Sequence, residues 1–378
     1  MNPSLHFDHI VIGAGSMGAA VCRELARRGR TVLGIDRFSV PHNRGSHGGE
    51  TRIIRKAYFE HPDYIPLLQS AYRGWAGLEE ETSEQIYFQT GLFYAGPSNS
   101  EILEGVKSAA SKYEIPLEKL DWNDSSTSLI IIPSHYELLF EPEAGFLLTN
   151  VALEGLIRTA LMHGARFMMD TVVTGWHNHK GLFYVTTNAG EFTCDKLIIT
   201  AGAWSARLLP KMASKLTVTR QVLAWYGVKN QNRFTLGDFP CWLIAEQDLP
   251  GAYYGFPVID SIPGNGLIKV AYHHRGGLAD PDSLAEPVKA WELEALNDFV
   301  SRTFEGVFSE PERTAVCYYV NSPDDDFIID QDGGLTYACG FSGHGFKFAP
   351  VIGEILADLS ITGSTNHPIG FLRADRLK

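Results

Sequence analysis

Features that would point to nucleic acid or to a membrane are scarce in this chain. Basic residues number 32 against 44 acidic ones, and the formal net charge is −12. Such an acidic balance disfavours non-specific binding to nucleic acid and to anionic membranes. No apolar run approaches membrane-spanning length, and the first one, residues 9–12, is too short for the core of a signal peptide. We therefore expect a cytoplasmic protein without a nucleic-acid or membrane partner.

Cysteine is also sparse and irregularly placed. None of the five cysteines belongs to a CxxC pair, and they are scattered as Cys22, Cys194, Cys241, Cys317 and Cys339. This spacing disfavours a zinc knot or a thioredoxin-type motif, and an odd number fits a reducing compartment better than a disulfide framework. We therefore expect neither a metal centre nor a disulfide framework.

What the chain does have is enough apolar material for a large core. It has 378 residues, of which 44% are hydrophobic, and by length alone it suggests two domains. Because internal repeats and low-complexity linkers are missing, we expect the domains to be interleaved, each built from discontinuous segments.

The N-terminal segment predicts a strand, a tight turn, a helix and a second strand. Residues 8–15 form an apolar β run that ends in glycine, residues 16–29 have helical periodicity, and residues 31–37 form the second strand. Residues 40–50 are rich in turn formers and are expected to be a loop.

Helical and strand patterns alternate along the rest of the chain. Residues 51–82 predict two helices, separated at His61-Pro62-Asp63. Further helices are predicted at residues 100–113, 150–165, 287–304 and 351–363. Strands are predicted in residues 86–96, in residues 165–204 with a hairpin turn at 188–190, in a second β-rich region at residues 218–320, and in residues 335–340.

Residues 13–18 form a complete G-x-G-x-x-G motif between the first predicted strand and helix. Gly13 permits the tight turn, Gly15 lets the backbone approach a pyrophosphate, and Gly18 lets the helix pack closely on the strand. The helix start, at Ser16 and Met17, offers free N–H groups and partial positive charge to phosphates. In this context the motif predicts a dinucleotide site.

The choice of dinucleotide depends on other residues. Asp36, at the end of the second strand, is placed to accept hydrogen bonds from ribose hydroxyls, and an acid there disfavours the 2′-phosphate of NADP. A late apolar strand at residues 197–204 and a glycine-rich turn at residues 340–350 favour FAD over NAD. Pro350 suits a first helical turn, whose N-terminus could stabilise an anionic reduced flavin. The alternative for that turn is a plain loop and a capped helix.

Six ordered segments carry a resemblance to a known family. They are VIGAGSMGAA, GSHGGETRIIRKAY, YYGFP, IKVAYH, AVCYYVNSPDDDFIID and GFSGHGFKF, spread from one end of the chain to the other. Through them the chain resembles the monomeric sarcosine oxidase and N-methyltryptophan oxidase family. The resemblance implies covalently bound FAD and hydride transfer from a secondary amino acid to flavin N5. It also implies hydrolysis of the resulting imine and reduction of O2 to H2O2.

The motif and the resemblance together predict an α/β fold (α+β, two-domain). A Rossmann-type FAD-binding domain would comprise residues 1–85, 146–217 and 321–378. An interleaved substrate domain, residues 86–145 and 218–320, would be built on a mixed, mainly antiparallel sheet. The site would lie between the two domains.

Three cations and one cysteine are candidates for the reaction centre. Cys317 lies in an apolar strand, where the usual meaning is a small core residue, but the resemblance implies a sulfur link to the 8α carbon of FAD. On a helix, Arg52 and Arg55 would share one face, and a solvated basic face is the usual meaning of such a pair. The resemblance instead places Arg52 beside the flavin ring and assigns Arg55, with Lys347, to the substrate carboxylate.

Lys269 and His273 fall on one face of a predicted strand. The resemblance places Lys269 near flavin N5, where its charge favours electron transfer to O2; the alternative is an edge-strand lysine in water. His273 is either a catalytic group or a structural residue. Tyr254, as a catalytic group, and Tyr319, as a substrate contact, match positions near the substrate, although aromatic residues in β regions are usually core.

The remaining cofactor contacts implied by the resemblance are Arg37, Ser46, His47, Thr51, Gly343, Gly345, Phe346 and Lys347. Gly48 departs from the family pattern, which usually has a second histidine there. The expected partners are a small amine and O2, and the expected state is a monomer. Alternative functions are oxidation of cyclic imino acids or fructosyl amino acids, a flavin dehydrogenase with another acceptor, and a flavin-binding module without turnover.

Overall fold

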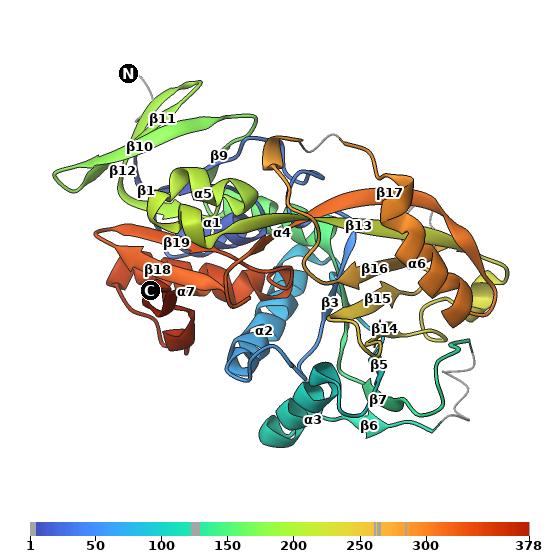
Figure 1. Cartoon of the computed structure of the whole chain (residues 1–378). Helices are drawn as coiled ribbons and strands as arrows, with labels where there is room; N and C mark the ends of the chain where they lie inside the picture. The colour runs from blue at the N-terminus through green and yellow to red at the C-terminus, as the bar shows by residue number, and fades with distance from the viewer. Residues whose placement is uncertain (1–4, 122–128, 261, 263–265, 284–285, 378) are drawn as a thin grey trace.

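The computed structural model describes residues 5–121, 129–260, 262, 266–283 and 286–377 (Figure 1). The strands of these segments form two large sheets and one small sheet. In the part of the chain so described, no helix combines the length and apolarity needed to span a bilayer.

The first sheet has a parallel centre, as the N-terminal pattern predicts. Its eight strands are β1 (His6–Ile12), β2 (Val32–Ile35), β9 (Arg166–Met168), β10 (Val173–His179), β11 (Leu182–Thr187), β12 (Gly190–Ile199), β18 (Ile328–Asp332) and β19 (Leu335–Cys339). β1 pairs in parallel with β2 and β12, and β12 pairs in parallel with β19. The antiparallel pair of β11 and β12 confirms the hairpin turn at 188–190.

Three helices confirm predicted helices, and two of them, the first and the last, pack against this sheet. They are α1 (Ser16–Arg27), α4 (Thr149–Met162) and α7 (Ala349–Thr362). α1 packs against both α4 and α7, and α7 packs against β12 and β19. Pro350 lies in the first turn of α7, where its missing N–H costs nothing.

The second sheet is mixed and mainly antiparallel, which confirms the prediction. Its order is β17-β13-β16-β15-β14-β5-β7-β6, and only β14 and β5 pair in parallel among these neighbours. The strands are β5 (Leu92–Gly96), β6 (Glu118–Lys119), β7 (Glu137–Glu141), β13 (Thr217–Val228), β14 (Cys241–Ile244), β15 (Ala252–Phe256), β16 (Leu267–His273) and β17 (Val307–Asn321). The predicted helices are present as α3 (Glu101–Tyr113), beside β5, and α6 (Ala290–Thr303), beside β13, β16 and β17.

The small sheet corrects one prediction. Residues 51–82 were expected to form two helices, but only α2 (Tyr64–Thr82) forms, directly after His61-Pro62-Asp63. The first part is β3 (Thr51–Ile54), which pairs with β8 (Gly145–Leu148), and β8 in turn pairs with β4 (Tyr87–Gln89). Pairing with a distant strand overrides the local helical pattern. Arg52 and Arg55 therefore do not share a helical face.

Short helical turns complete the chain, namely η2 (Gly202–Trp204), α5 (Ser205–Leu208), η3 (Pro210–Lys215), η4 (Gln231–Arg233), η5 (Pro281–Ser283), η6 (Phe346–Phe348), η7 (Gly370–Leu372) and η8 (Ala374–Leu377). The first large sheet draws its strands from residues 6–35, 166–199 and 328–339, and the second from residues 92–141 and 217–321. The chain thus passes repeatedly between the two sheets (Figure 1). The boundaries of the two expected domains stay a prediction.

Candidate active site

The turn between β1 and α1 requires glycine at the predicted positions. Gly13 has a φ of 92°, and a Cβ there would lie 2.5 Å from the carbonyl oxygen of Thr200. A Cβ on Gly18 would lie 1.8 Å from the carbonyl oxygen of Gly13. The helix therefore approaches the strand closely, and its N-cap, Gly15, provides no side chain to cap the first N–H groups.

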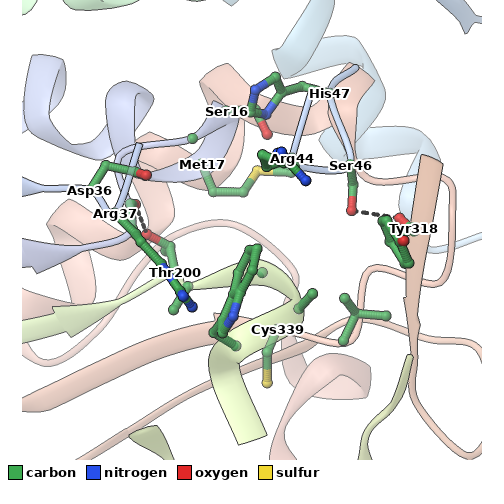
Figure 2. Close-up of a pocket in the computed structure, with 18 of the residues that line it drawn as sticks. Ser16, Met17, Asp36, Arg37, Arg44, Ser46, His47, Thr200, Tyr318 and Cys339 are labelled. Atoms are coloured by element: carbon green, nitrogen blue, oxygen red, sulfur yellow. Dashed lines mark hydrogen bonds between the residues drawn. The ribbon is translucent and has the colours of Figure 1, made fainter. Parts of the chain in front are cut away.

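A cavity of about 310 Å³ opens in front of this turn (Figure 2). Its volume falls in the range of roughly 300–1,000 Å³ that is usual for cofactor sites. The uncapped start of α1 lies at its wall, where the N–H groups and the helix dipole favour phosphate. The predicted cofactor residues in its lining are Gly13, Gly15, Ser16, Met17, Asp36, Arg37, Ser46, His47, Gly343, Gly345 and Phe346.

Four predicted cofactor residues lie outside this lining. Gly18 packs behind the turn, and Lys347 lies in a second cavity. Thr51 holds the side chain of Lys269, and Cys317 lies beside the loop that carries Ser46. Their contact with a cofactor stays a prediction.

Asp36 has oxygen lone pairs to spare after its backbone contacts. Its Oδ2 accepts a hydrogen bond from the backbone N–H of Ala14 at 2.8 Å, and its Oδ1 accepts one from that of Phe38 at 3.0 Å. A carboxylate offers about four acceptor sites. The residue therefore keeps acceptors for hydroxyl groups at the cavity wall, which fits a ribose.

Residues from three segments close one side of the cavity, and sequence reasoning missed most of them. Arg37, Trp204 and Arg207 line the cavity, and all three donate hydrogen bonds to Asp282 of η5, at 2.8, 2.9 and 2.5 Å. The bonds from Trp204 and Arg207 lower the pKa of Asp282 to about 2. No local motif marks Asp282, because its partners come from other parts of the fold.

The loop after β2 connects this cavity to the second sheet. The hydroxyl of Ser46 donates to the carbonyl oxygen of Tyr318 in β17 at 2.7 Å (Figure 2). Burial lowers the pKa of His47, in the same loop, to about 3. His47 is therefore neutral at pH 7.

A second cavity, of about 60 Å³, adjoins the first. Four residues line both of them: Arg52, Tyr319, Gly343 and Phe346. All the predicted substrate and catalytic side chains except Lys269 line the second cavity, namely Arg52, Arg55, Tyr254, His273, Tyr319 and Lys347. The structure therefore brings together residues from β3, β15, β16, β17 and η6.

Arg55 is buried at this cavity and is already paired. Its Nη2 lies 2.7 Å from both carboxylate oxygens of Glu60, and its guanidinium lies 4.4 Å from the ring centre of Tyr58 and 4.2 Å from that of Phe59. Burial alone would raise the pKa of Glu60, but the charge of Arg55 lowers it to about 2. No sequence pattern marks Glu60, because an acid in a loop has no periodicity.

Lys347 is the second buried cation of this cavity. Its Nζ donates to the carbonyl oxygen of His344 at 3.0 Å. Burial and then the charge of Arg55 lower the pKa of Lys347 to about 7, against the opposing charge of Glu60. His344, which sequence reasoning also missed, lies 2.5 Å from the hydroxyl of Tyr58 through its Nδ1.

Arg52 lies where the two cavities meet, next to Cys317. Its Nη2 donates to the carbonyl oxygens of Ser46 and Gly48, both at 2.6 Å, and lies 3.4 Å from the sulfur of Cys317. Cys339, which lines the larger cavity, is also buried, and burial raises the pKa of its thiol to about 12.

Lys269 is a buried lysine, which excludes the edge-strand alternative. β16 lies between β13 and β15 in the sheet, and Lys269 is 3% exposed. Its Nζ donates to the carbonyl oxygen of Gly49 at 2.6 Å and to the carbonyl and hydroxyl oxygens of Thr51, both at 3.1 Å. Three acceptors match the three donors of an ammonium group. Burial and the charge of Arg52 lower the pKa of Lys269 well below its usual range.

His273 contacts the phenol of Tyr319, with 3.0 Å between its Nδ1 and the hydroxyl oxygen. Burial lowers the pKa of His273 to about 4, so the imidazole is neutral at pH 7. Burial also raises the pKa of both Tyr254 and Tyr319. The wall of the second cavity on this side is therefore uncharged and offers hydroxyl groups as donors.

These observations define an α/β dinucleotide-binding fold with a buried pocket, lined by Arg52, Arg55 and Lys347, beside the dinucleotide cavity. Residues 8–359 match the family model described as FAD dependent oxidoreductase. The chain belongs to this family, and the match confirms the predicted fold class.

The curated relatives agree with the predicted resemblance. The chain is 36% identical to monomeric sarcosine oxidase from Bacillus sp. (strain NS-129), over 99% of this chain and 97% of that protein. It is 35% identical to monomeric sarcosine oxidase from Streptomyces avermitilis, over 100% of this chain and 99% of that protein. It is 33% identical to N-methyl-L-tryptophan oxidase from Yersinia pestis (strain Pestoides F), over 93% of this chain and 94% of that protein.

Solved structures show the same fold at lower identity. NikD, an unusual amino acid oxidase essential for nikkomycin biosynthesis, has a TM-score of 0.86 at 22% identity, with 97% of each chain covered. L-proline dehydrogenase from P. horikoshii has a TM-score of 0.83 at 20% identity, with 99% of this chain and 98% of that chain covered.

Proposed function

We propose that this protein is an FAD-dependent oxidase of small secondary amino acids. The observation that carries the proposal is the pair of buried cations, Arg55 and Lys347, in a small cavity that shares its wall with the dinucleotide cavity. An arginine and a lysine in a buried pocket can bind a carboxylate and fix its orientation. The oxidised carbon would then face the shared wall, formed in part by Arg52 and Tyr319.

The residues of the larger cavity fit FAD. The uncapped start of α1 would hold the pyrophosphate, and Asp36 would accept hydrogen bonds from the ribose. Bound FAD supplies the two-electron acceptor for a hydride from the carbon next to nitrogen. We propose that Cys317 holds the flavin covalently, because its sulfur lies 3.4 Å from Arg52, which lines both cavities, and 3.6 Å from the carbonyl oxygen of Ser46, which lines the larger one.

Substrate binding would change the pairing of Arg55. Its guanidinium faces Glu60 in the described structure, so an incoming carboxylate must share or replace that partner. The amine of Lys347 would become protonated as the substrate carboxylate binds, because an opposite charge favours the ammonium form. The uncharged wall of His273 and Tyr319 would favour the neutral form of the substrate amine, which would release its proton to solvent on binding. Hydride would then leave the carbon next to the nitrogen.

The size of the second cavity favours a short substrate. A volume of about 60 Å³ corresponds to the liquid volume of about two water molecules. This is closer to the size of sarcosine than to that of an N-methylated tryptophan. Phe59, Leu243 and Tyr254 bound the cavity and would limit the side chain.

O2 would be the electron acceptor, with H2O2 as the product and water hydrolysing the imine. Lys269 supports this choice, because a buried ammonium group stabilises negative charge that develops on O2. A dehydrogenase that uses another acceptor is the alternative. The amount of H2O2 formed per substrate consumed would be compared with the amount of dye reduced. H2O2 formed in amounts equal to the substrate consumed would favour the oxidase.

Covalent flavin can be tested by colour. We expect acid precipitation of the purified protein to leave the yellow flavin in the pellet, and Cys317→Ser to release it to the supernatant. Cys241→Ser is the matched control, because that cysteine is equally buried and lies outside the lining of both cavities. Release of flavin from the unaltered protein would return Cys317 to a packing role.

The substrate can be tested by anaerobic reduction of the flavin. We expect sarcosine to bleach it faster than N-methyltryptophan, proline or a fructosyl amino acid. Arg55→Met should raise the KM for sarcosine by about 100-fold or more, because it removes a charge-assisted contact worth about 3 kcal/mol. If no amine bleaches the flavin, the protein is a flavin-binding module without turnover and the proposal fails.

Two further expectations belong to this proposal. We propose that the protein acts as a monomer, as the names of the sarcosine oxidase relatives suggest for those proteins. We also propose a cytoplasmic location. Light scattering and cell fractionation would test these two points.

A further inference from the structure

A buried carboxylate lies behind the segment that carries Arg55, and no part of the proposed reaction uses it. Glu141 is the last residue of β7 and is 0% exposed. Its Oε1 accepts a hydrogen bond from the backbone N–H of Lys56 at 2.5 Å, and both of its oxygens lie 3.3 Å from the backbone nitrogen of Ala57. Tyr94 of β5 donates its hydroxyl to Oε2 at 2.7 Å.

These contacts satisfy the carboxylate and hold it in one orientation. Burying a carboxylate is costly unless its oxygens are hydrogen-bonded. Burial raises the pKa of Glu141, and the hydrogen bonds from Tyr94, Lys56 and Ala57 oppose that rise. All three partners donate, so the ionised form is the one that fits the site.

The backbone that Glu141 holds is directly connected to Arg55. Lys56 follows Arg55 in the chain, and the carbonyl oxygen of Ala57 accepts a hydrogen bond from Nη1 of Arg55 at 2.8 Å. The guanidinium thus lies between Ala57 on one side and Glu60 on the other. A shift of the Lys56–Ala57 peptide would move the guanidinium in the second cavity.

We propose that Glu141 is a positioning residue for the substrate carboxylate. It fixes the backbone after Arg55 and so sets the place where the guanidinium meets that carboxylate. The inference rests on the proposed function, because it requires Arg55 to bind the carboxylate. A displaced guanidinium would weaken its contact with the carboxylate, because a charge-assisted hydrogen bond between these two groups depends on their geometry.

A neighbouring acid provides a matched control. Glu143 follows in the same turn and also contacts Lys56, but its carboxylate pairs with the side-chain Nζ, at 2.7 Å. Glu143→Gln therefore removes a charge from this turn and leaves the backbone clamp in place. Glu141→Gln keeps the size of the side chain but loses one acceptor oxygen. Glu141→Asp keeps the charge, but its side chain is one methylene shorter, so its oxygens lie farther from the backbone N–H groups.

The experiment measures carboxylate affinity apart from catalysis. Propanoate, which has no amine to oxidise, is titrated into each flavin-loaded variant, and the change in the visible flavin spectrum gives Kd. We expect Kd to rise about tenfold in both Glu141 variants and less than about twofold in Glu143→Gln. We also expect KM for sarcosine to rise with Kd, while kcat stays within about threefold.

Two outcomes would overturn the positioning role. One is an unchanged propanoate Kd in folded Glu141→Asp, which carries the test even if Glu141→Gln does not fold. The other is an equal loss of affinity in Glu143→Gln. Arg55→Met separates this inference from the proposed function: if it binds propanoate as well as the unaltered protein does, the carboxylate site itself is wrong. If Arg55→Met loses propanoate affinity while both Glu141 variants bind propanoate normally, only the positioning role is rejected.

Discussion

Lys347 shows how burial makes a single lysine sensitive to pH near neutrality. Its side chain is 7% exposed, and its pKa is lowered to about 7 by burial and by the charge of Arg55. In the cavity without substrate, about half of the molecules would carry a neutral amine at pH 7. Binding of a carboxylate then favours uptake of a proton, because the opposite charge raises the pKa of the amine.

This linkage predicts that carboxylate affinity falls with rising pH. We expect the Kd of propanoate to be constant well below pH 7 and to rise above it, approaching about tenfold per pH unit. Propanoate is the better probe, because the amine of the natural substrate also titrates. Lys347→Met should bind more weakly and with no such slope between pH 6 and pH 9. A flat profile in the unaltered protein would mean that Lys347 is not a carboxylate partner.

Single residues could be assigned from the sequence only where an ordered segment carried them. Arg55 and Lys347 stand in segments that resemble the family, and the structure brings both to one cavity. Glu60 and His344 line the same cavity but were missed. Glu60 lies in a loop outside those segments, whereas His344 stands in the same segment as Lys347 and was not singled out there. The contacts of both residues exist only after the loops fold against each other.

The turn from β1 to α1 is the element that the sequence predicted best. All of its determinants are local: a short apolar strand, three glycines and an amphipathic helix. β3 is the opposite case. It pairs with β8, which lies far along the chain, and its pattern taken alone was misread as helix. Local periodicity therefore predicts self-contained elements, whereas strands defined by a distant partner escape it.

Gly18, at the start of α1, and Gly77, in α2, allow a paired test of two helical glycines. A Cβ on Gly18 would lie 1.8 Å from a backbone oxygen, so Gly18→Ala must displace α1 from β1. We expect a loss of about 3 kcal/mol or more in the free energy of unfolding, with loss of bound flavin. A Cβ on Gly77 in α2 would meet no atom of the described residues within 4 Å beyond its own helix backbone and chain neighbours. Gly77→Ala should therefore gain up to about 1 kcal/mol.

Thermal unfolding and the flavin-to-protein absorbance ratio would measure both variants. Equal flavin content in Gly18→Ala and the unaltered protein would show that the helix can move without losing its phosphate site. A destabilised Gly77→Ala would mean that this face of α2 has a partner.

At the scale of the whole molecule, the candidate site belongs to no single element. Arg52 comes from the small sheet, Lys269 and Cys317 from the second large sheet, and Lys347 from the turn before α7. The sequence could indicate these side chains one by one. Their distances follow from how three sheets pack together, which no local pattern encodes. Asp282, which joins three residues of the larger cavity, is hidden for the same reason.

The packed interior also predicts how the protein responds to acid. Burial lowers the pKa of His9 to about 4 and that of His47 and His344 to about 3, whereas an unfolded histidine titrates near 6.5. Between these values the unfolded chain binds more protons than the folded one, so stability is lost as pH falls. We expect these three histidines to lower the free energy of unfolding by on the order of 8 kcal/mol between pH 6.5 and pH 4. Denaturant titrations across this range would measure it.

His9 provides the sharpest control for that prediction. It is 3% exposed, and neither of its ring nitrogens has a hydrogen-bond partner among the described residues. His9→Leu would therefore remove a buried titrating group without breaking a hydrogen bond, at similar volume. We expect this variant to be at least as stable as the unaltered protein at pH 7 and to lose less stability by pH 4, by up to about 3 kcal/mol. If both proteins lose stability in parallel, His9 accepts its proton without unfolding, and the acid response belongs to the histidines of the site.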